Sequence, residues 1–520
     1  MKRYHLTIAG GGATYTPGIV NAILNARDVL PLRKLVLLDN DAERVATMGG
    51  FIRLLLAEKA PEVELVITTD RQEAFTGMEF LFAQIRSGGL AMRAQDEQIP
   101  LRHGVVGQET CGPGGFAFAL RSIPDMLAIG EDVRRYAPDA WILNYSNPAA
   151  ILADLWHKRF PELKSLFICD MPIVIELLVA ATLGYRHADL AFEYVGLNHF
   201  GWWRHIWNPQ GEDLLPKLRD HLLSERPLTL FQDEHVNADW VPTFERLRKS
   251  MRLFPEFLSN TYLQYYYFGE EMVAHEDPHY SRANRVIDTR EKSVFDECRR
   301  CIAIGSAADS FLCAGVHGDF IVDHARAILT NQPFRTTVNV PNRGLVPGLP
   351  ADAIVEVHGQ VTAHGVEAFG VGELPHFQRA LMVQQNAYEQ LTVEAALEGS
   401  YTKALQALTL NRTVPSADVA KRLLDDLLAA PAFWVTIQIP PQTSSKASMF
   451  FQAQIDSPRK TAERAAPKIG IKKLNTVTMP TLLYLSRIVQ SANDTEDSST
   501  MYSINADDFR VKPVRTPPVA

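Results

Sequence analysis

The sequence has no long apolar run, few cysteines and no excess of positive charge. No stretch approaches about eighteen consecutive apolar residues, so we expect no membrane-spanning helix. The N-terminus, residues 1–9, lacks the apolar stretch and small-residue cleavage site of a signal peptide and is typical of a first strand. The net charge of −8 argues against a general nucleic-acid binder.

The cysteine content argues against a disulfide framework. The five cysteines are scattered and odd in number, which predicts a reducing, cytoplasmic location (Cys111, Cys169, Cys298, Cys301 and Cys313). Cys298 and Cys301 have the spacing of a redox or zinc pair, but they lie in a helical stretch without a second pair. We therefore interpret them as ordinary cysteines.

Strand-like and helix-like segments alternate through the first third of the chain. Helices are predicted at 17–30 and 41–59, and Pro17 stands in a first turn, where a helix tolerates proline. The alternation predicts a Rossmann-type doubly wound parallel sheet, in which ligands bind beyond the carboxyl ends of the strands. Strands are predicted at 4–9, 34–39, 63–69, 80–84, 141–144 and 165–169.

A glycine-rich turn follows the first predicted strand and precedes a helix. Its backbone amides can approach a pyrophosphate at the helix N-terminus, which assigns cofactor binding to Gly10, Gly11, Gly12 and Thr14. The match to the dinucleotide pattern is imperfect because Tyr15 replaces its last glycine, and a turn that binds nothing is the alternative.

Asp39 ends the second predicted strand. An acidic residue there can accept hydrogen bonds from both ribose hydroxyls, which favours NAD over NADP.

The length of the chain predicts more than one domain. We expect an NAD-binding Rossmann-like domain in 1–195, a mixed α+β substrate domain in 196–438 and an atypical tail in 439–520. In the second domain, aromatics and short strands come first, and helices are predicted at 282–311, 375–399 and 416–428. The tail begins at a breaker-rich stretch, is net positive and ends without a core-forming pattern, so we expect partial disorder.

A thiol, a carboxyl group and an imidazole follow the nucleotide-binding pattern. Cys169 and Asp170 close the last predicted strand, and His199 lies in the next aromatic segment. These groups beside a dinucleotide suit metal-assisted chemistry with a hydride step. Taken alone, Cys169 is more simply an inert buried thiol, His199 a structural histidine, and Asp170 a helix N-cap or supporting residue.

Four separate motifs occur in the chain: Gly-Gln-Glu-Thr-Cys-Gly-Pro-Gly-Gly at 107–115, Asn-Tyr-Ser-Asn-Pro at 144–148, Cys-Asp-Met-Pro at 169–172 and Gly-Leu-Asn-His-Phe-Gly-Trp-Trp at 196–203. Through these motifs the chain resembles glycoside hydrolase family 4 from about residue 4 to about residue 435. Cys-Asp-Met-Pro is the form found in the 6-phospho-α-glucosidase (maltose-6'-phosphate glucosidase) branch, whereas the phospho-β-glucosidases have Asn after the cysteine. The resemblance implies a fold like that of lactate and malate dehydrogenases.

The resemblance implies a metal site and a general acid. Cys169 and His199 would hold a divalent ion, typically Mn²⁺ with other divalent metals possible, although a thiolate by itself favours zinc. Asp170 would be the general acid that protonates the leaving glycosidic oxygen, so it must hold its proton at neutral pH.

The resemblance also implies a base and residues that bind the sugar phosphate. Tyr262 would be the base, with Tyr265 as its main competitor and Glu109 increasing the basicity of the tyrosine. For Arg93 and Arg282, the alternative is a surface charge exposed to solvent. The residues that would bind the sugar 6-phosphate are Arg93, Asn147 and Arg282.

The implied activity is hydrolysis of 6-phospho-α-glucosides, such as maltose 6'-phosphate, to glucose 6-phosphate and glucose. It would proceed by oxidation at carbon 3, elimination, addition of water and reduction, with NAD recycled. The alternatives are a 6-phospho-β-glucosidase or other family 4 glycosidase, an NAD-dependent hydroxy-acid or sugar dehydrogenase, and a non-catalytic sensor. We expect a phosphorylated disaccharide as ligand and a homodimer or homotetramer, with no nucleic acid or membrane as partner.

Overall fold

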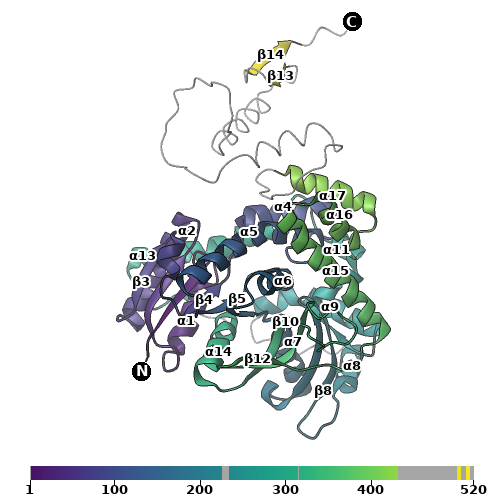
Figure 1. The fold of residues 1–520 in the computed structure, drawn as a ribbon, viewed down its shortest axis with the longest axis horizontal. Helices are drawn as coiled ribbons and strands as arrows, with labels where there is room; N and C mark the ends of the chain where they lie inside the picture. The colour runs from purple at the N-terminus through teal and green to yellow at the C-terminus, as the bar shows by residue number, and fades with distance from the viewer. Residues whose placement is uncertain (1, 225–233, 314–315, 431–499, 505–510, 516–520) are drawn as a thin grey trace. The chain divides into compact units, whose positions relative to one another are not determined.

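The computed structural model describes residues 2–224, 234–313, 316–430, 500–504 and 511–515 (Figure 1). The chain divides into two units, Met1–Ile437 and Gln438–Ala520, and every candidate site residue lies in the first. In the second unit, β13 (Thr500–Ile504) pairs antiparallel with β14 (Val511–Arg515). Most residues of the tail for which partial disorder is predicted lie outside the described ranges.

A six-stranded parallel sheet forms the first half of unit one. The strand order is β3-β2-β1-β4-β5-β6, in which the chain crosses from β3 back beside β1, as in doubly wound nucleotide-binding folds. Almost all of β1, β2 and β4 is buried, as expected for parallel strands with both faces covered. The strands are β1 (Tyr4–Ala9), β2 (Leu32–Leu38), β3 (Glu64–Thr68), β4 (Phe80–Ala83), β5 (Trp141–Asn144) and β6 (Lys164–Phe167).

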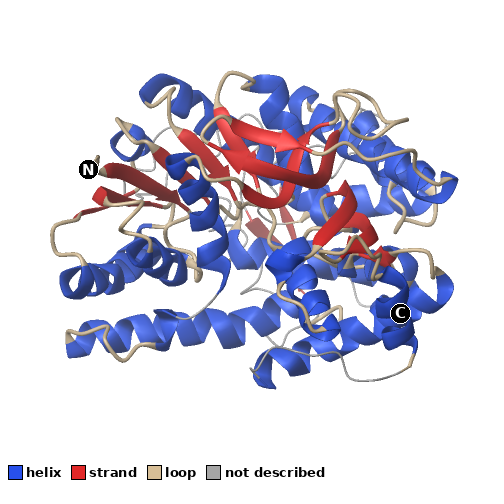
Figure 2. Cartoon of the chain, turned by 90° about the horizontal axis from the view of Figure 1, so that it is seen from below, coloured by secondary structure: helices blue, strands red, loops and turns tan. Residues whose placement is uncertain are grey.

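Helices connect these strands and cover both faces of the sheet (Figure 2). Local sequence sets their ends: Asp41 caps α2 by accepting from the amides of Glu43 and Arg44, and Gly184 ends α7 in the left-handed conformation. The helices are α1 (Thr16–Asn25), α2 (Ala42–Lys59), α3 (Arg71–Phe75), α4 (Gly89–Arg102), α5 (Gly112–Tyr136), α6 (Ala149–Arg159) and α7 (Met171–Leu183).

The second half adds antiparallel strands to the same sheet. From β6 the order continues β10-β11-β7-β8-β9, and β12 pairs with β11. The two halves of the sheet are joined where β6 pairs with β10, and this pairing consists of one residue pair, Phe167 with Asn339. The strands are β7 (Ala191–Leu197), β8 (Phe200–Trp207), β9 (Leu258–Ser259), β10 (Phe334–Pro341), β11 (Ile354–Thr362) and β12 (Gly365–Ala368).

Helices of the second half return to the first. α15 and α17 (green) lie beside α5 and α4, far away in the sequence (Figure 1). The helices are α8 (Leu215–Leu223), α9 (Glu234–Leu253), α10 (Gln264–Tyr267), α11 (Gly269–Ala274), α12 (Arg282–Val286), α13 (Lys292–Ile304), α14 (Val316–Thr330), α15 (His376–Glu398), α16 (Tyr401–Leu410) and α17 (Ala417–Ala429). Shorter turns are η1 (His187–Asp189), η2 (Thr261–Leu263), the π-helical η3 (Ile287–Glu291) and η4 (Phe311–Cys313).

One apolar core runs through both halves. It contains Leu6 and Ile8 of β1 together with Trp202 of β8, all completely buried. Burial of each such large side chain stabilises the fold by about 1.5–3 kcal/mol. A second cluster packs α7 and α8 against β7 and β8 around Tyr194 and Trp203.

The predicted fold class is confirmed, with strand and helix bounds shifted by a few residues. The helix predicted at 282–311 is a continuous helical run of α12, η3 and α13 that ends at Ile304, because Gly305 adopts the left-handed conformation there. The boundary predicted near residue 195 stays a prediction, because residues on both sides of it contribute to one sheet. No helix in the described ranges is long and apolar enough to cross a membrane.

Candidate functional site

The glycine-rich turn lies between β1 and α1 and is packed too tightly for side chains. A Cβ atom on Gly10, where φ is +81°, would lie 2.6 Å from the carbonyl oxygen of Gln84. A Cβ on Gly11 would lie 2.9 Å from the Cβ of Leu37. Thr14 is half-buried in the same turn. The turn therefore leaves bare backbone at a helix N-terminus, which fits the pyrophosphate of a dinucleotide.

Asp39 follows β2 and faces this turn. One carboxylate oxygen accepts from the Gly12 amide at 2.8 Å, and the other accepts from the Asp41 amide at 3.1 Å. Arg44 donates to the Gly12 carbonyl at 3.0 Å and pairs with Glu291. The carboxylate is thereby fixed where the ribose of a dinucleotide would lie.

Cys169 and His199 meet although they come from different parts of the sheet. Cys169 follows β6, and His199 lies in the tight turn between β7 and β8, where its φ is +63°. The Cys169 Sγ and His199 Nε2 atoms are 3.5 Å apart, and both side chains are buried. A sulfur and a nitrogen bound at about 2.3 and 2.0 Å to one tetrahedral ion lie about 3.5 Å apart.

A second hydrogen bond orients the His199 ring. The Thr110 hydroxyl donates to Gln108 Oε1 at 2.9 Å, so its oxygen can accept from His199 Nδ1, which lies 3.1 Å away. This arrangement assigns the proton to Nδ1 and directs the lone pair of Nε2 toward Cys169. Burial lowers the pKa of His199 to about 4, which keeps the ring neutral and able to bind a metal.

The donor set fits a cation held partly by the substrate. Within the described ranges, no three His, Cys, Asp or Glu side chains gather as a ready-made metal cluster. An ion bound by Cys169 and His199 would therefore keep positions open for oxygen atoms of substrate and water. Burial, followed by the charges of Glu356 and Asp170, raises the pKa of the Cys169 thiol well above its usual range. Cation binding must therefore displace the thiol proton.

Tyr262 stacks directly on the His199 ring. The ring centroids are 3.8 Å apart and the planes differ by 12°. Burial raises the pKa of Tyr262 well above 10, and the neighbouring Cys169 and Glu109 raise it further. The phenolate would be a strong base, but a positive charge must favour its formation. Tyr265, the predicted competitor, has its ring centroid 6.2 Å from that of Tyr262.

Glu109 lies between two arginines. Arg86 contacts one carboxylate oxygen at 2.6 Å and Arg93 contacts the same oxygen at 3.1 Å. Burial opposes ionisation, but the two guanidinium groups outweigh it and hold the pKa of Glu109 at about 2. Arg93 also pairs with Glu97 at 2.7 Å and is 4% exposed, so a phosphate group would have to share it with two carboxylates.

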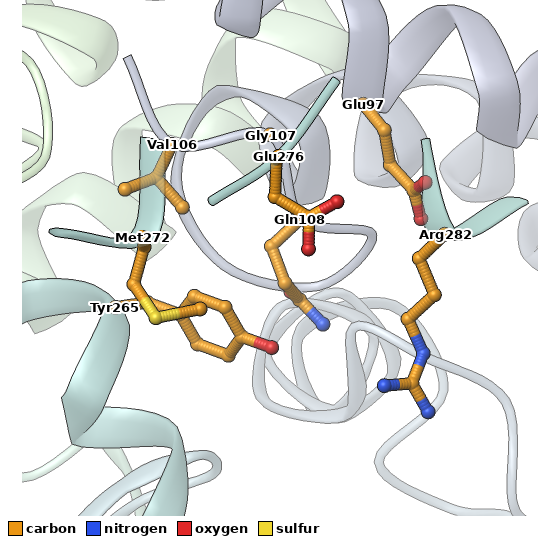
Figure 3. Close-up of a pocket in the computed structure, with 8 residues that line it drawn as sticks. All are labelled: Glu97, Val106, Gly107, Gln108, Tyr265, Met272, Glu276 and Arg282. Carbon is orange, nitrogen blue, oxygen red and sulfur yellow. The ribbon is translucent and has the colours of Figure 1, made fainter. Parts of the chain in front are cut away.

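Arg282 begins α12 and lines a pocket together with Glu97. In Figure 3, its guanidinium lies in the pocket with the Tyr265 hydroxyl and the Gln108 side chain, while Glu97 projects from the helix behind. Arg282 is exposed and its positive charge acts on Glu109. Its charge is thus more accessible to an incoming anion than that of Arg93.

Asp170 and Asn147 follow the adjacent strands β6 and β5. Asp170 occupies the N-cap position of α7 without making a side-chain capping bond, and it is half-buried. Its hydrogen bond and charge contribute, after burial, to the raised pKa of Tyr145. Asn147 is half-buried, next to Ser146, whose hydroxyl accepts from the Ile85 amide at 2.9 Å.

The structure thus brings Cys169, His199 and Tyr262 into contact with one another. The glycine-rich turn, Asn147 and Asp170 follow parallel strands of one sheet and therefore lie at the same carboxyl edge.

Three residues that contact the site were not predicted from the sequence: Thr110, Arg86 and Glu356. Thr110 lies in the motif at 107–115, directly after the predicted site residue Glu109, and this position is the sequence signal that could have identified it. Glu356 lies in the strand Ile354–Thr362, where polar residues alternate with apolar ones as on a strand with one solvent-facing side, so no sequence signal marks it as buried.

Comparisons with known proteins agree with this geometry. The family described as "Family 4 glycosyl hydrolase" matches residues 5–185, and "Family 4 glycosyl hydrolase C-terminal domain" matches residues 194–414. A maltose-6'-phosphate glucosidase of Fusobacterium mortiferum is 45% identical over 441 residues, which are 84% of this chain and 100% of the relative.

Two solved structures of 6-phospho-α-glucosidase from gut microorganisms are similar throughout. One, in complex with NAD and Mn²⁺, has 41% sequence identity and a TM-score of 0.80, covering 84% of this chain and 100% of that chain. The other, in complex with NAD and glucose 6-phosphate, has 40% identity, a TM-score of 0.80 and the same coverage.

Proposed function

The chain belongs to family 4 of the glycosyl hydrolases, and we propose that it hydrolyses 6-phospho-α-glucosides such as maltose 6'-phosphate. The products are glucose 6-phosphate and glucose. The observation that carries this proposal is the contact of Cys169 Sγ with His199 Nε2, with Tyr262 stacked on the imidazole. Likeness to 6-phospho-α-glucosidases solved with NAD, Mn²⁺ and glucose 6-phosphate supports it.

The cofactors are NAD and a divalent cation, with Mn²⁺ as the first choice. When bound, NAD supplies reversible hydride transfer at carbon 3 of the sugar, and the cation supplies Lewis-acid polarisation of the resulting carbonyl. Gly10, Gly11, Gly12 and Thr14 would bind the dinucleotide phosphates, and Asp39 would bind its ribose. Cys169 and His199 would hold the cation.

The chain's own residues carry the proton transfers. Tyr262 accepts the proton from carbon 2, and the negative charge of Glu109 strengthens the phenolate as a base. Asp170 donates a proton to the leaving glycosidic oxygen. Arg282, Arg93 and Asn147 bind the 6-phosphate, with Arg282 offering the most accessible charge.

The test is release of p-nitrophenol from the α and β anomers of p-nitrophenyl glucoside 6-phosphate, with and without Mn²⁺ and NAD⁺. We expect cleavage of the α anomer only when both cofactors are present, without net accumulation of NADH. Rising NADH absorbance without p-nitrophenol release would instead indicate a dehydrogenase. Preference for the β anomer would contradict the α assignment.

Replacement of Asp39 by serine is expected to raise the KM for NAD⁺ about 10- to 100-fold and to reduce discrimination against NADP⁺. The substitution removes hydrogen bonds to the ribose and the negative charge that repels a 2'-phosphate. Initial rates with each dinucleotide measure both effects. Asp41→Ser, which alters the cap of α2 instead, is the control; equal effects of the two substitutions would contradict the ribose assignment.

The quaternary structure and location remain predictions of this proposal. We expect a homodimer or homotetramer in the cytoplasm, acting on a phosphorylated disaccharide that has already entered the cell. Sedimentation equilibrium of the full chain measures the number of subunits.

A further inference from the structure

A buried carboxylate lies at the centre of a polar network behind the site. Glu356 is on β11, opposite Asn339 of β10 and Gly196 of β7, and it is 0% exposed. Three side chains donate to it: Asn198 at 2.9 Å, Tyr194 at 2.9 Å and Asn339 at 3.3 Å. Because all three are donors, they suit a group that can only accept.

Two of these donors lead to the cation-binding pair. Asn198 directly precedes His199 in the tight turn between β7 and β8. Asn339 Nδ2 also donates to the Phe167 carbonyl at 3.1 Å, at the end of β6 and two residues before Cys169. Glu356 therefore connects the backbone segments that carry the thiol and the imidazole, which come from separate parts of the sheet.

The third donor leads to the proposed base. The Tyr194 hydroxyl donates to Glu356 and accepts from Asn260 Nδ2 at 3.0 Å. Asn260 Oδ1 in turn accepts from the Tyr262 amide at 3.0 Å, which caps η2. Tyr194 and Asn260 are 0% and 1% exposed, so water cannot readily replace these bonds.

We propose that Glu356 is a positioning residue that holds Cys169, His199 and Tyr262 in register through Asn339, Asn198 and Tyr194. This inference rests on the proposed function, since it assigns Glu356 to the same reaction. Glu356 contacts neither sugar nor dinucleotide in this role. It fixes the backbone segments from which three reacting side chains project.

The substitution Glu356→Gln tests whether the hydrogen bonds of Glu356, rather than its packing volume, position the site. Glutamine keeps the shape but replaces one acceptor by an NH₂ group. If that group faces Tyr194, the tyrosine hydroxyl lies between two donors; if it faces Asn198 and Asn339, two amides lose their acceptor. Either orientation leaves a buried donor without a partner, which weakens at least one connection.

The first measurement is Mn²⁺ binding to the full chain without substrate, followed by electron paramagnetic resonance of the unbound ion. We expect Glu356→Gln to raise the Kd for Mn²⁺ about 10- to 100-fold, as loss of a supporting hydrogen bond does at other metal sites. Glu389→Gln is the matched control. Glu389 is also buried, at 4% exposed, but it accepts from Gln385 on the same helix, so this variant should keep the wild-type Kd for Mn²⁺.

The second variant, Tyr194→Phe, tests the connection to the base. It removes the hydroxyl shared by Glu356 and Asn260 while leaving Asn198 and Asn339 bonded. We expect kcat and the exchange of the carbon-2 proton with solvent deuterium to fall about 10- to 100-fold together, with KM and Mn²⁺ affinity near wild type. A merely structural role would lower the melting temperature without this split.

These experiments distinguish failure of the positioning role of Glu356 from failure of the proposed hydrolase function. Wild-type Mn²⁺ affinity in folded Glu356→Gln, or wild-type kcat in Tyr194→Phe, would overturn the positioning role. If Glu356→Gln does not fold, as judged by circular dichroism, Tyr194→Phe decides. A wild-type chain that cleaves neither anomer would contradict the proposed function, whereas the substrate-free Mn²⁺ titration would still test Glu356.

Discussion

Replacing Tyr262 by phenylalanine is expected to lower kcat about a thousandfold with little change in KM. A positioned general base contributes about 10²- to 10⁴-fold to a rate, and the substitution removes the phenolic oxygen that accepts the carbon-2 proton. The ring itself remains, so its stacking on His199 at 3.8 Å should persist and the fold should be preserved.

Solvent exchange measures the missing step directly. During turnover in D₂O, the wild-type chain should incorporate deuterium at carbon 2 of glucose 6-phosphate, and Tyr262→Phe should not. Tyr265→Phe is the matched control, because Tyr265 lies in the same segment but in the neighbouring pocket (Figure 3). If Tyr265→Phe abolished exchange while Tyr262→Phe kept it, the assignment of the base would have to be reversed.

Replacing Cys169 by serine is expected to lower turnover at least about 100-fold and to weaken Mn²⁺ binding by at least the same factor, because it removes one of two protein ligands. Serine keeps the size of the side chain but offers a hydroxyl in place of a thiolate. Removal of metal from the wild-type chain by chelation should likewise abolish activity, and added Mn²⁺ should restore it.

The measurement combines p-nitrophenol release with a Mn²⁺ titration. Cys298→Ser is the control, since Cys298 is a fully buried thiol in α13, away from the site, and its replacement should leave both quantities unchanged. Full turnover of Cys169→Ser in the presence of chelator would refute the metal assignment and, with it, the proposed reaction.

The sequence was most informative where short-range patterns determine structure. The strand at 4–9, the glycine-rich turn and Asp39 belong to one strand–helix–strand unit, so their spatial relation follows from chain order and the handedness of the connection. Cys169 could be placed in the same way, because it follows a parallel strand and must lie at the carboxyl edge of the sheet.

Long-range pairing could not be obtained from local patterns. The joint of β6 with β10 brings Phe167 beside Asn339, and nothing in either segment specifies that pairing. The partners of Glu356 depend on the same joint, and its alternation with Val355 and Val357 is equally typical of a solvent-facing carboxylate. The role of Tyr262 came from family resemblance alone, because a run of tyrosines is equally typical of aromatic packing.

The backbone of His199 has a consequence for the evolution of the chain. A non-glycine residue in the left-handed region costs about 1–2 kcal/mol, and glycine in this turn would avoid that cost. The backbone conformation of His199 therefore lowers the stability of the turn between β7 and β8, at the position where the imidazole faces the thiol of Cys169. Glycine would relieve the backbone, but it would also remove the buried ring that stacks on Tyr262 and bonds to Thr110, and the cavity left behind costs more than the strain. A variant library screened only for melting temperature should therefore not enrich glycine at this position.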